Sequence, residues 1–159
     1  MVIERMSRPF LLGLSLSATI AGVAYSHQGA TGVVKQRMDA MGEMGDHSSA
    51  VADMFKGKAA YDSQVIASAA KVFVQHGKTM TSLFPDTDMS RTGSQTEALP
   101  AIWTRWSDFS DLADEFVTRS EELAVLATTT NDKRVLKRNF FKTTKSCSAC
   151  HKQFRETKK

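Results

Sequence analysis

The sequence is poor in cysteine, with two in a chain of 159 residues. Both belong to one pentapeptide, Cys147-Ser148-Ala149-Cys150-His151, so there is no wider disulfide framework. A four-coordinate zinc site would need two further ligands at suitable spacing, and no second cysteine pair supplies them. No stretch shows the sustained alternation of a strand, so the βαβ surroundings of a thioredoxin-like redox motif are missing as well.

The spacing of the pentapeptide instead predicts covalent attachment of a c-type haem. Cys147 and Cys150 stand three positions apart, so each can add across one vinyl group of the haem and form a thioether. His151 follows directly and is placed to bind the iron as an axial ligand. The expected cofactor is one covalent haem c per chain, with its iron.

A long hydrophobic run is also lacking, because a membrane-spanning helix needs roughly 20 apolar residues. The apolar run at 10–24 is shorter, follows a basic start and ends in small residues at Ala24 and Ser26. This layout predicts a cleavable secretory signal peptide over residues 1–26 and a mature domain over 27–159. We expect export to the periplasm by a Sec-type route, since no Arg-Arg pair marks a twin-arginine signal. An uncleaved membrane anchor is the alternative.

Hydrophobic residues at steps of three and four predict that the mature chain is helical, each helix having one buried face. The stripes run from Val34 to Phe55, Val65 to Leu83, Ile102 to Ala127, and Leu136 to Phe154. Asp62 or Ser63 and Asn131 or Asp132 are suited to cap the second and fourth helices, and Pro100 to open the third. With 84–99 as a long loop, these features predict an all-α, antiparallel four-helix bundle with the haem near its C-terminus.

An exported four-helix bundle with this motif near its C-terminus resembles the class II cytochromes c, the family of cytochrome c′ and cytochrome c-556. Residues 34–42 are similar to the Arg-x-x-x-Met/Leu segment of that family's first helix. Residues 147–155 resemble its haem segment, including the aromatic residue and the arginine after the histidine. Residues 100–103 resemble the entry to its third helix. The resemblance covers 30–157.

The resemblance implies roles for three further residues. Arg37 would pair with a haem propionate rather than lie in solvent, and Arg155 would tune His151 from the proximal side rather than lie on plain surface. Met41 follows Arg37 by one helical turn and shares its face. In the c-556 type a methionine here binds the iron, whereas in the c′ type this residue covers a five-coordinate iron, so both roles stay open. The remaining methionines of the first two helices are expected in the core, namely Met38, Met44, Met54 and Met80.

The expected function is electron transfer with periplasmic redox partner proteins. The alternative is a five-coordinate haem protein that binds small gases such as nitric oxide, with a protective or sensing role. The chain is not expected to be an enzyme, because the distal stretch offers methionines and an alanine where a peroxidase needs a base and a donor. Turnover of nitric oxide or peroxide is the alternative. The family resemblance also suggests a homodimer through the first two helices.

Basic residues gather toward the C-terminal end of the chain, from Lys133 to Lys159. The ordinary interpretation is the solvated face of a helix. The alternative is a docking surface for an acidic redox partner near the haem, where charge would speed encounter. No motif supports nucleic-acid binding.

Overall fold

The computed structural model describes residues 29–157. The predicted signal peptide, residues 1–26, lies outside these described residues, and its cleavage stays a prediction. Within the described part of the chain, no helix is both long enough and apolar enough to cross a membrane.

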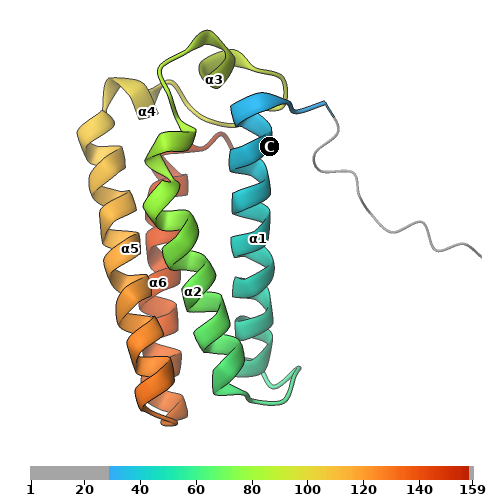
Figure 1. Cartoon of the computed structure of the whole chain (residues 1–159), viewed down its shortest axis with the longest axis vertical. Coiled ribbons are helices and arrows are strands. Elements are labelled where there is room, and N and C mark those ends of the chain that lie inside the picture. Colours follow the sequence, from blue (N-terminus) through green and yellow to red (C-terminus); the bar gives the residue numbers. More distant parts are fainter. Residues whose placement is uncertain (1–28, 158–159) are drawn as a thin grey trace, which may run out of the picture.

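Four long helices run alternately up and down to form an antiparallel bundle (Figure 1). They are α1 (Gly32–Phe55), α2 (Ser63–Thr79), α5 (Trp106–Thr129) and α6 (Lys133–Phe154). The connection between α2 and α5 holds a 3₁₀ turn, η1 (Thr81–Leu83), and two short helices, α3 (Asp88–Thr92) and α4 (Ala101–Thr104). The prediction of an all-α four-helix bundle is confirmed.

Two of the predicted helix caps form in the structure. The Asp62 carboxylate accepts a hydrogen bond of 2.8 Å from the backbone amide of Gln64 at the start of α2. The Asp132 carboxylate accepts bonds from the amides of Arg134 (2.8 Å) and Val135 (3.3 Å) at the start of α6. The bonds at both caps satisfy amides that have no partner within the helix. The two bonds that Asp132 accepts also hold the pKa of its carboxyl group below the usual value.

The connection at 84–99 differs from the open loop that the sequence predicts. It contains α3, and the third predicted helix is interrupted at Arg105, whose φ of −126° and ψ of 48° are not helical. Trp106 therefore leaves the predicted buried stripe and is 41% exposed. The periodicity on both sides of Arg105 is helical, so the stripe alone does not reveal a single residue that departs from helical geometry.

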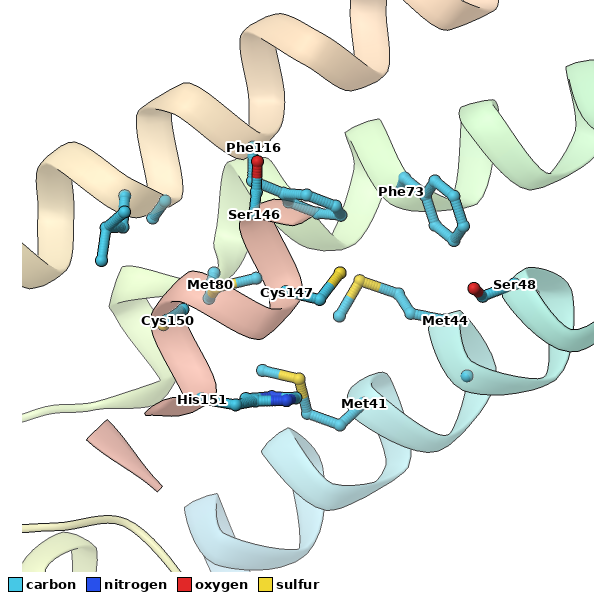
Figure 2. Close-up of a pocket in the computed structure, with 13 residues that line it drawn as sticks. Met41, Met44, Ser48, Phe73, Met80, Phe116, Ser146, Cys147, Cys150 and His151 are labelled. Carbon is cyan, nitrogen blue, oxygen red and sulfur yellow. The ribbon is translucent and has the colours of Figure 1, made fainter. Parts of the chain in front are cut away.

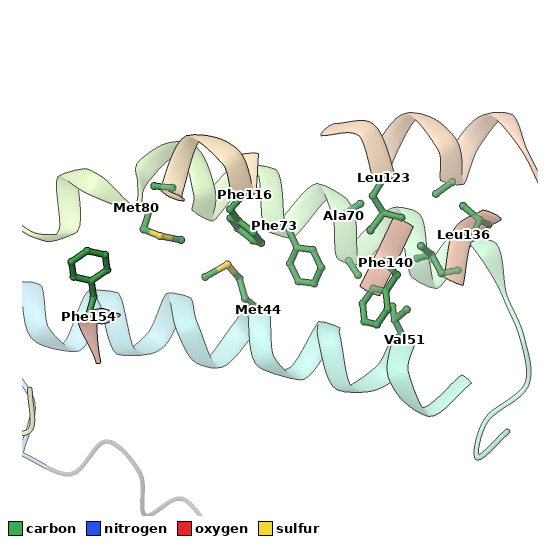
Figure 3. Close-up of a cluster of buried hydrophobic side chains, with 14 of the residues drawn as sticks. Met44, Val51, Ala70, Phe73, Met80, Phe116, Leu123, Leu136, Phe140 and Phe154 are labelled. Atoms are coloured by element: carbon green, nitrogen blue, oxygen red, sulfur yellow. The ribbon is translucent and has the colours of Figure 1, made fainter. Parts of the chain in front are cut away.

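The core forms along the inner faces of the four helices (Figure 3). α2 packs closely against α5, α5 against α6, and α1 against α2, whereas α1 and α6 approach each other less closely. The fully buried side chains include Ile66, Phe109, Leu123 and Phe140. The bundle is therefore closed on three sides and looser between α1 and α6.

The residues of α1 that the hydrophobic pattern predicts to be buried match the buried face of the helix only in part. The buried residues of this helix are Val34, Arg37, Ala40, Met44, Val51 and Met54. Three members of the predicted stripe, Met41, Gly45 and Ser48, instead line a cavity that faces α6. Hydrophobic periodicity cannot distinguish a face that packs on helices from a face that borders an apolar cavity, because both are lined by apolar side chains.

Candidate functional site

A cavity lies where α1 and α6 stay apart (Figure 2). Its volume is about 160 Å³, and the space around it that opens to solvent brings the empty space to about 700 Å³. All four long helices contribute to its wall, with Met41, Met44, Gly45, Ser48, Phe73, Met80, Leu112, Ala113, Phe116, Ser146, Cys147, Cys150 and His151. The lining is predominantly apolar.

The α6 side of the cavity carries the whole Cys-x-x-Cys-His motif. Cys147 and Cys150 are free thiols, partly buried and turned to the same cavity. Burial raises the pKa of both thiols, that of Cys150 to about 11. Burial also lowers the pKa of His151, an effect strengthened by the positive charge of Arg155 and opposed by Glu97. The imidazole is therefore neutral at neutral pH, which is the form that binds a metal.

The α1 side of the cavity is formed by sulfur and small residues. In Figure 2 the Met41 side chain extends toward the His151 ring, and the Met44 side chain extends toward Cys147. A Cβ built at Gly45 would meet no atom within 4 Å, so space is open beside the backbone of α1 at this point. Met44 and Met80, expected as core residues, are buried and also line the cavity.

Arg37 does not line the cavity, although it is buried. Its guanidinium donates hydrogen bonds to the Ser90 hydroxyl (3.2 Å), the Ser90 carbonyl (2.7 Å) and the Thr96 hydroxyl (2.6 Å). It also lies over the Phe84 ring, 4.8 Å from the centroid. Arg37 therefore ties segment 84–99 to α1, a role that sequence reasoning missed because Ser90 and Thr96 are more than 50 positions away. Its pairing with a haem propionate stays a prediction.

Arg155 ties the same segment to the end of α6. Its Nε donates to the Glu97 carboxylate at 2.9 Å, and Arg155 and Ala98 form an isolated antiparallel bridge. The amide of Leu99 also donates to the Phe154 carbonyl at 3.0 Å. Segment 84–99 thus joins the two helices that carry Met41 and His151. Arg155 lies outside the cavity lining, and after burial its positive charge is the second cause that lowers the pKa of His151. Its role in tuning a haem ligand stays a prediction.

His76 lies on α2, away from the cavity. Its Nε2 atom forms a hydrogen bond of 2.7 Å with the Glu43 carboxylate on α1, and neither side chain lines the cavity. Across residues 29–157, no group of three or more His, Cys, Asp or Glu side chains is arranged to hold a metal ion. A site built on three or more such side chains is therefore absent from the described residues, and His151 would hold iron only together with a cofactor.

The residues present fit a covalently attached haem. Two free thiols and a neutral imidazole lie on one helix and face an apolar cavity, and the space beside Gly45 leaves room for a flat group. Apolar walls suit a macrocycle whose faces are hydrophobic. The fold and the site together define a c-type haem protein built on a four-helix bundle.

Comparison with known proteins narrows this class. The family model described as cytochrome c′ matches residues 32–155. A cytochrome c′ of Rhodopseudomonas palustris is 32% identical over 145 residues, 89% of this chain and 96% of the relative. A solved structure of cytochrome c′ from this species has a TM-score of 0.73 at 30% identity, covering 81% of this chain and 99% of the other.

The chain is also similar to a cytochrome c-556 and to a ligand complex of a cytochrome c prime. A cytochrome c-556 of Agrobacterium tumefaciens is 29% identical over 124 residues, 78% of this chain and 97% of the relative. A nitric oxide complex of a mutant cytochrome c prime from Alcaligenes xylosoxidans has a TM-score of 0.68 at 25% identity, covering 79% of this chain and 94% of the other. The chain belongs to the cytochrome c′ family, within the class II cytochromes c, and its cofactor is covalent haem c.

Proposed function

We propose that this protein is a periplasmic electron carrier in which His151 and Met41 would both bind the haem iron. The observation that supports the proposal is that Met41 on α1 and His151 on α6 line the same cavity from facing helices. When bound, the haem supplies an iron that changes by one electron between its ferric and ferrous forms.

Each part of the site has a separate task in this proposal. Cys147 and Cys150 hold the cofactor covalently, and burial keeps His151 neutral for ligation. The Met41 thioether favours ferrous over ferric iron and so raises the reduction potential. Phe73, Phe116 and the other apolar side chains of the wall keep water from the cofactor.

The second candidate function is binding of a small gas at a five-coordinate iron. It is supported by the similarity to the nitric oxide complex of cytochrome c prime. It is also supported by the apolar α1 side of the cavity, where Met41 and Met44 would form a removable cover without hydrogen-bond donors. The role would then be protective or sensing. In both functions the protein is a carrier or binder without turnover.

Absorption spectra of the oxidised protein and of Met41→Ala distinguish the two functions. If Met41 is a ligand, the unmodified protein is low spin at neutral pH and Met41→Ala is high spin, because removal of the thioether opens the sixth position. Met44→Leu is the control, since it keeps an apolar side chain of similar size in the same wall and should stay low spin. If the unmodified protein is already high spin and binds carbon monoxide readily when reduced, gas binding is the better proposal.

A further inference from the structure

The charges of α5 and α6 are strongly segregated. α6 (Lys133–Phe154) has seven basic residues and no acidic residue. The neighbouring α5 (Trp106–Thr129) has six acidic residues and one arginine. Two adjacent helices of one bundle therefore present opposite charge to solvent, although the net charge of the whole chain is only +4.

Most of the basic side chains on α6 form no ion pair with an acidic residue of 29–157. Lys142 pairs with Glu122 on α5 at 3.0 Å. Five others are exposed and form no ion pair with any residue of 29–157, namely Arg134, Lys137, Arg138, Lys145 and Lys152. The cluster is therefore not used to hold α6 on the bundle, and its charge is available to an external partner.

Four of these five residues, all except Lys137, lie on one stripe on the outer side of α6. Positions 134, 138, 141, 145, 148 and 152 follow one another at steps of four and three, which places them on one helix face, and all six are exposed. Phe141 is the apolar member of this stripe, 40% exposed. The stripe reaches Ser148 and Lys152, which alternate along α6 with Cys147 and Cys150. The basic stripe therefore runs up to the residues that hold the haem.

We infer that the exposed face of α6 is the docking surface for an acidic electron-transfer protein. The inference rests on the proposed electron-carrier function and adds the surface and the charge of its partner. An acidic protein is favoured over an anionic membrane or a nucleic acid because the stripe adjoins the residues that would hold the haem, and of these three partners only a redox protein could exchange an electron with it. One electron would pass between the bound haem and the partner's redox centre, with no bond formed or broken.

Charged small oxidants test the surface in the intact haem protein. Reduced protein is mixed with anionic hexacyanoferrate(III) or with cationic tris(phenanthroline)cobalt(III). The ionic strength is kept low, at about 10 mM, so that charge is weakly screened. For Lys145→Glu we expect oxidation by the anionic reagent to slow about fivefold and oxidation by the cationic reagent to accelerate. A change of reduction potential would move both rates in the same direction, so opposite changes identify an electrostatic effect at the site of electron exit.

Lys71→Glu is the matched control. Lys71 is exposed on α2, has no ion pair within residues 29–157, and its replacement changes the net charge by the same amount. We expect Lys71→Glu to change either rate less than twofold, because α2 does not pack closely against α6 and the effect of a charge falls with distance. Equal effects of Lys71→Glu and Lys145→Glu would overturn the docking surface while leaving the electron-carrier proposal intact.

A binding measurement separates docking from electron flow. Calorimetric titration with poly-L-glutamate should show salt-dependent binding that Lys145→Glu weakens and Lys71→Glu largely retains. Tighter binding to phosphatidylglycerol vesicles than to poly-L-glutamate, lost in Lys145→Glu, would overturn the acidic protein as partner. A high-spin spectrum of the unmodified oxidised protein would overturn iron binding by Met41. The calorimetric comparison does not depend on that ligand, so it would still test the α6 surface.

Discussion

At the scale of single residues, the two thiols of α6 differ from cysteines that have a purely structural role. They are not joined in a disulfide, they lie three positions apart, and both are partly buried, where they pack against the core and line the cavity. Both thiols are therefore accessible to a group bound in the cavity.

Replacement of both thiols should release the cofactor. We expect the haem of the unmodified protein to stay with the polypeptide through acid-acetone extraction, and that of Cys147→Ala plus Cys150→Ala to be extracted, because only thioether bonds resist this treatment. Ser148→Ala, between the two thiols and exposed, should keep the haem. A mass of the unmodified protein equal to that of the polypeptide alone would contradict covalent attachment.

At the scale of secondary-structure elements, segment 84–99 has a larger role than a connection. Arg37 binds it to α1 and Arg155 binds it to the end of α6, at the end of the bundle where the start of α1, α3 and the C-terminal end of α6 lie together (Figure 1). Because α1 and α6 approach each other less closely than the other neighbouring helices, this segment helps to hold the two walls of the cavity in place.

Loss of the Arg37 guanidinium should release that segment. Arg37→Met removes three hydrogen bonds from a buried charged donor, so we expect a destabilisation of about 2–4 kcal/mol in urea unfolding. Trypsin should also cut faster at Arg91, which lies within the segment, because local opening exposes the backbone. Lys35→Met, on the exposed face of α1, should change stability by less than about 0.5 kcal/mol. Unchanged cleavage at Arg91 would contradict the tie between Arg37 and the segment.

Two glycines of the long helices should respond in opposite ways to alanine. A Cβ at Gly77 would lie 2.9 Å from the Val117 Cγ2 atom and 3.2 Å from the Phe116 ring, so Gly77→Ala should push α2 from α5 and cost about 1–3 kcal/mol. A Cβ at Gly45 meets nothing within 4 Å, and Gly45→Ala should stabilise the haem-free chain by about 1 kcal/mol. Urea unfolding of the haem-free variants measures both, and a more stable Gly77→Ala protein would contradict close packing of α2 on α5.

At the scale of the whole molecule, we expect export to precede haem attachment. The described residues 29–157 form one bundle, and the apolar run at 10–24 lies outside the described residues. The short apolar run after a basic start is the feature that predicts its removal during transport. The periplasmic location and the possible homodimer remain predictions.

Mass spectrometry of the purified haem protein tests export. We expect a mature N-terminus near His27, because small residues at Ala24 and Ser26 suit cleavage directly before it. The protein should be recovered from the periplasmic fraction after osmotic shock. Full-length protein with haem attached in the cytoplasmic fraction would contradict this prediction.

The sequence by itself determined the fold class and the cofactor, because both depend on local patterns. Helical periodicity and caps such as Asp62 and Asp132 depend on residues within one or two turns, and thioether attachment depends on the three-residue spacing of Cys147 and Cys150. These features would be recognisable in an isolated segment of the chain.

Only the tertiary structure decided which faces meet and which long-range partners form. The bonds from Arg37 to Ser90 and Thr96, the interruption at Arg105 and the division of the apolar side of α1 between core and cavity cannot be read from periodicity. Each depends on how the four helices pack, which is determined by the sum of many weak contacts between residues far apart in sequence. The same packing places Met41 and His151 on facing helices around one cavity, although 109 intervening residues separate them in the chain.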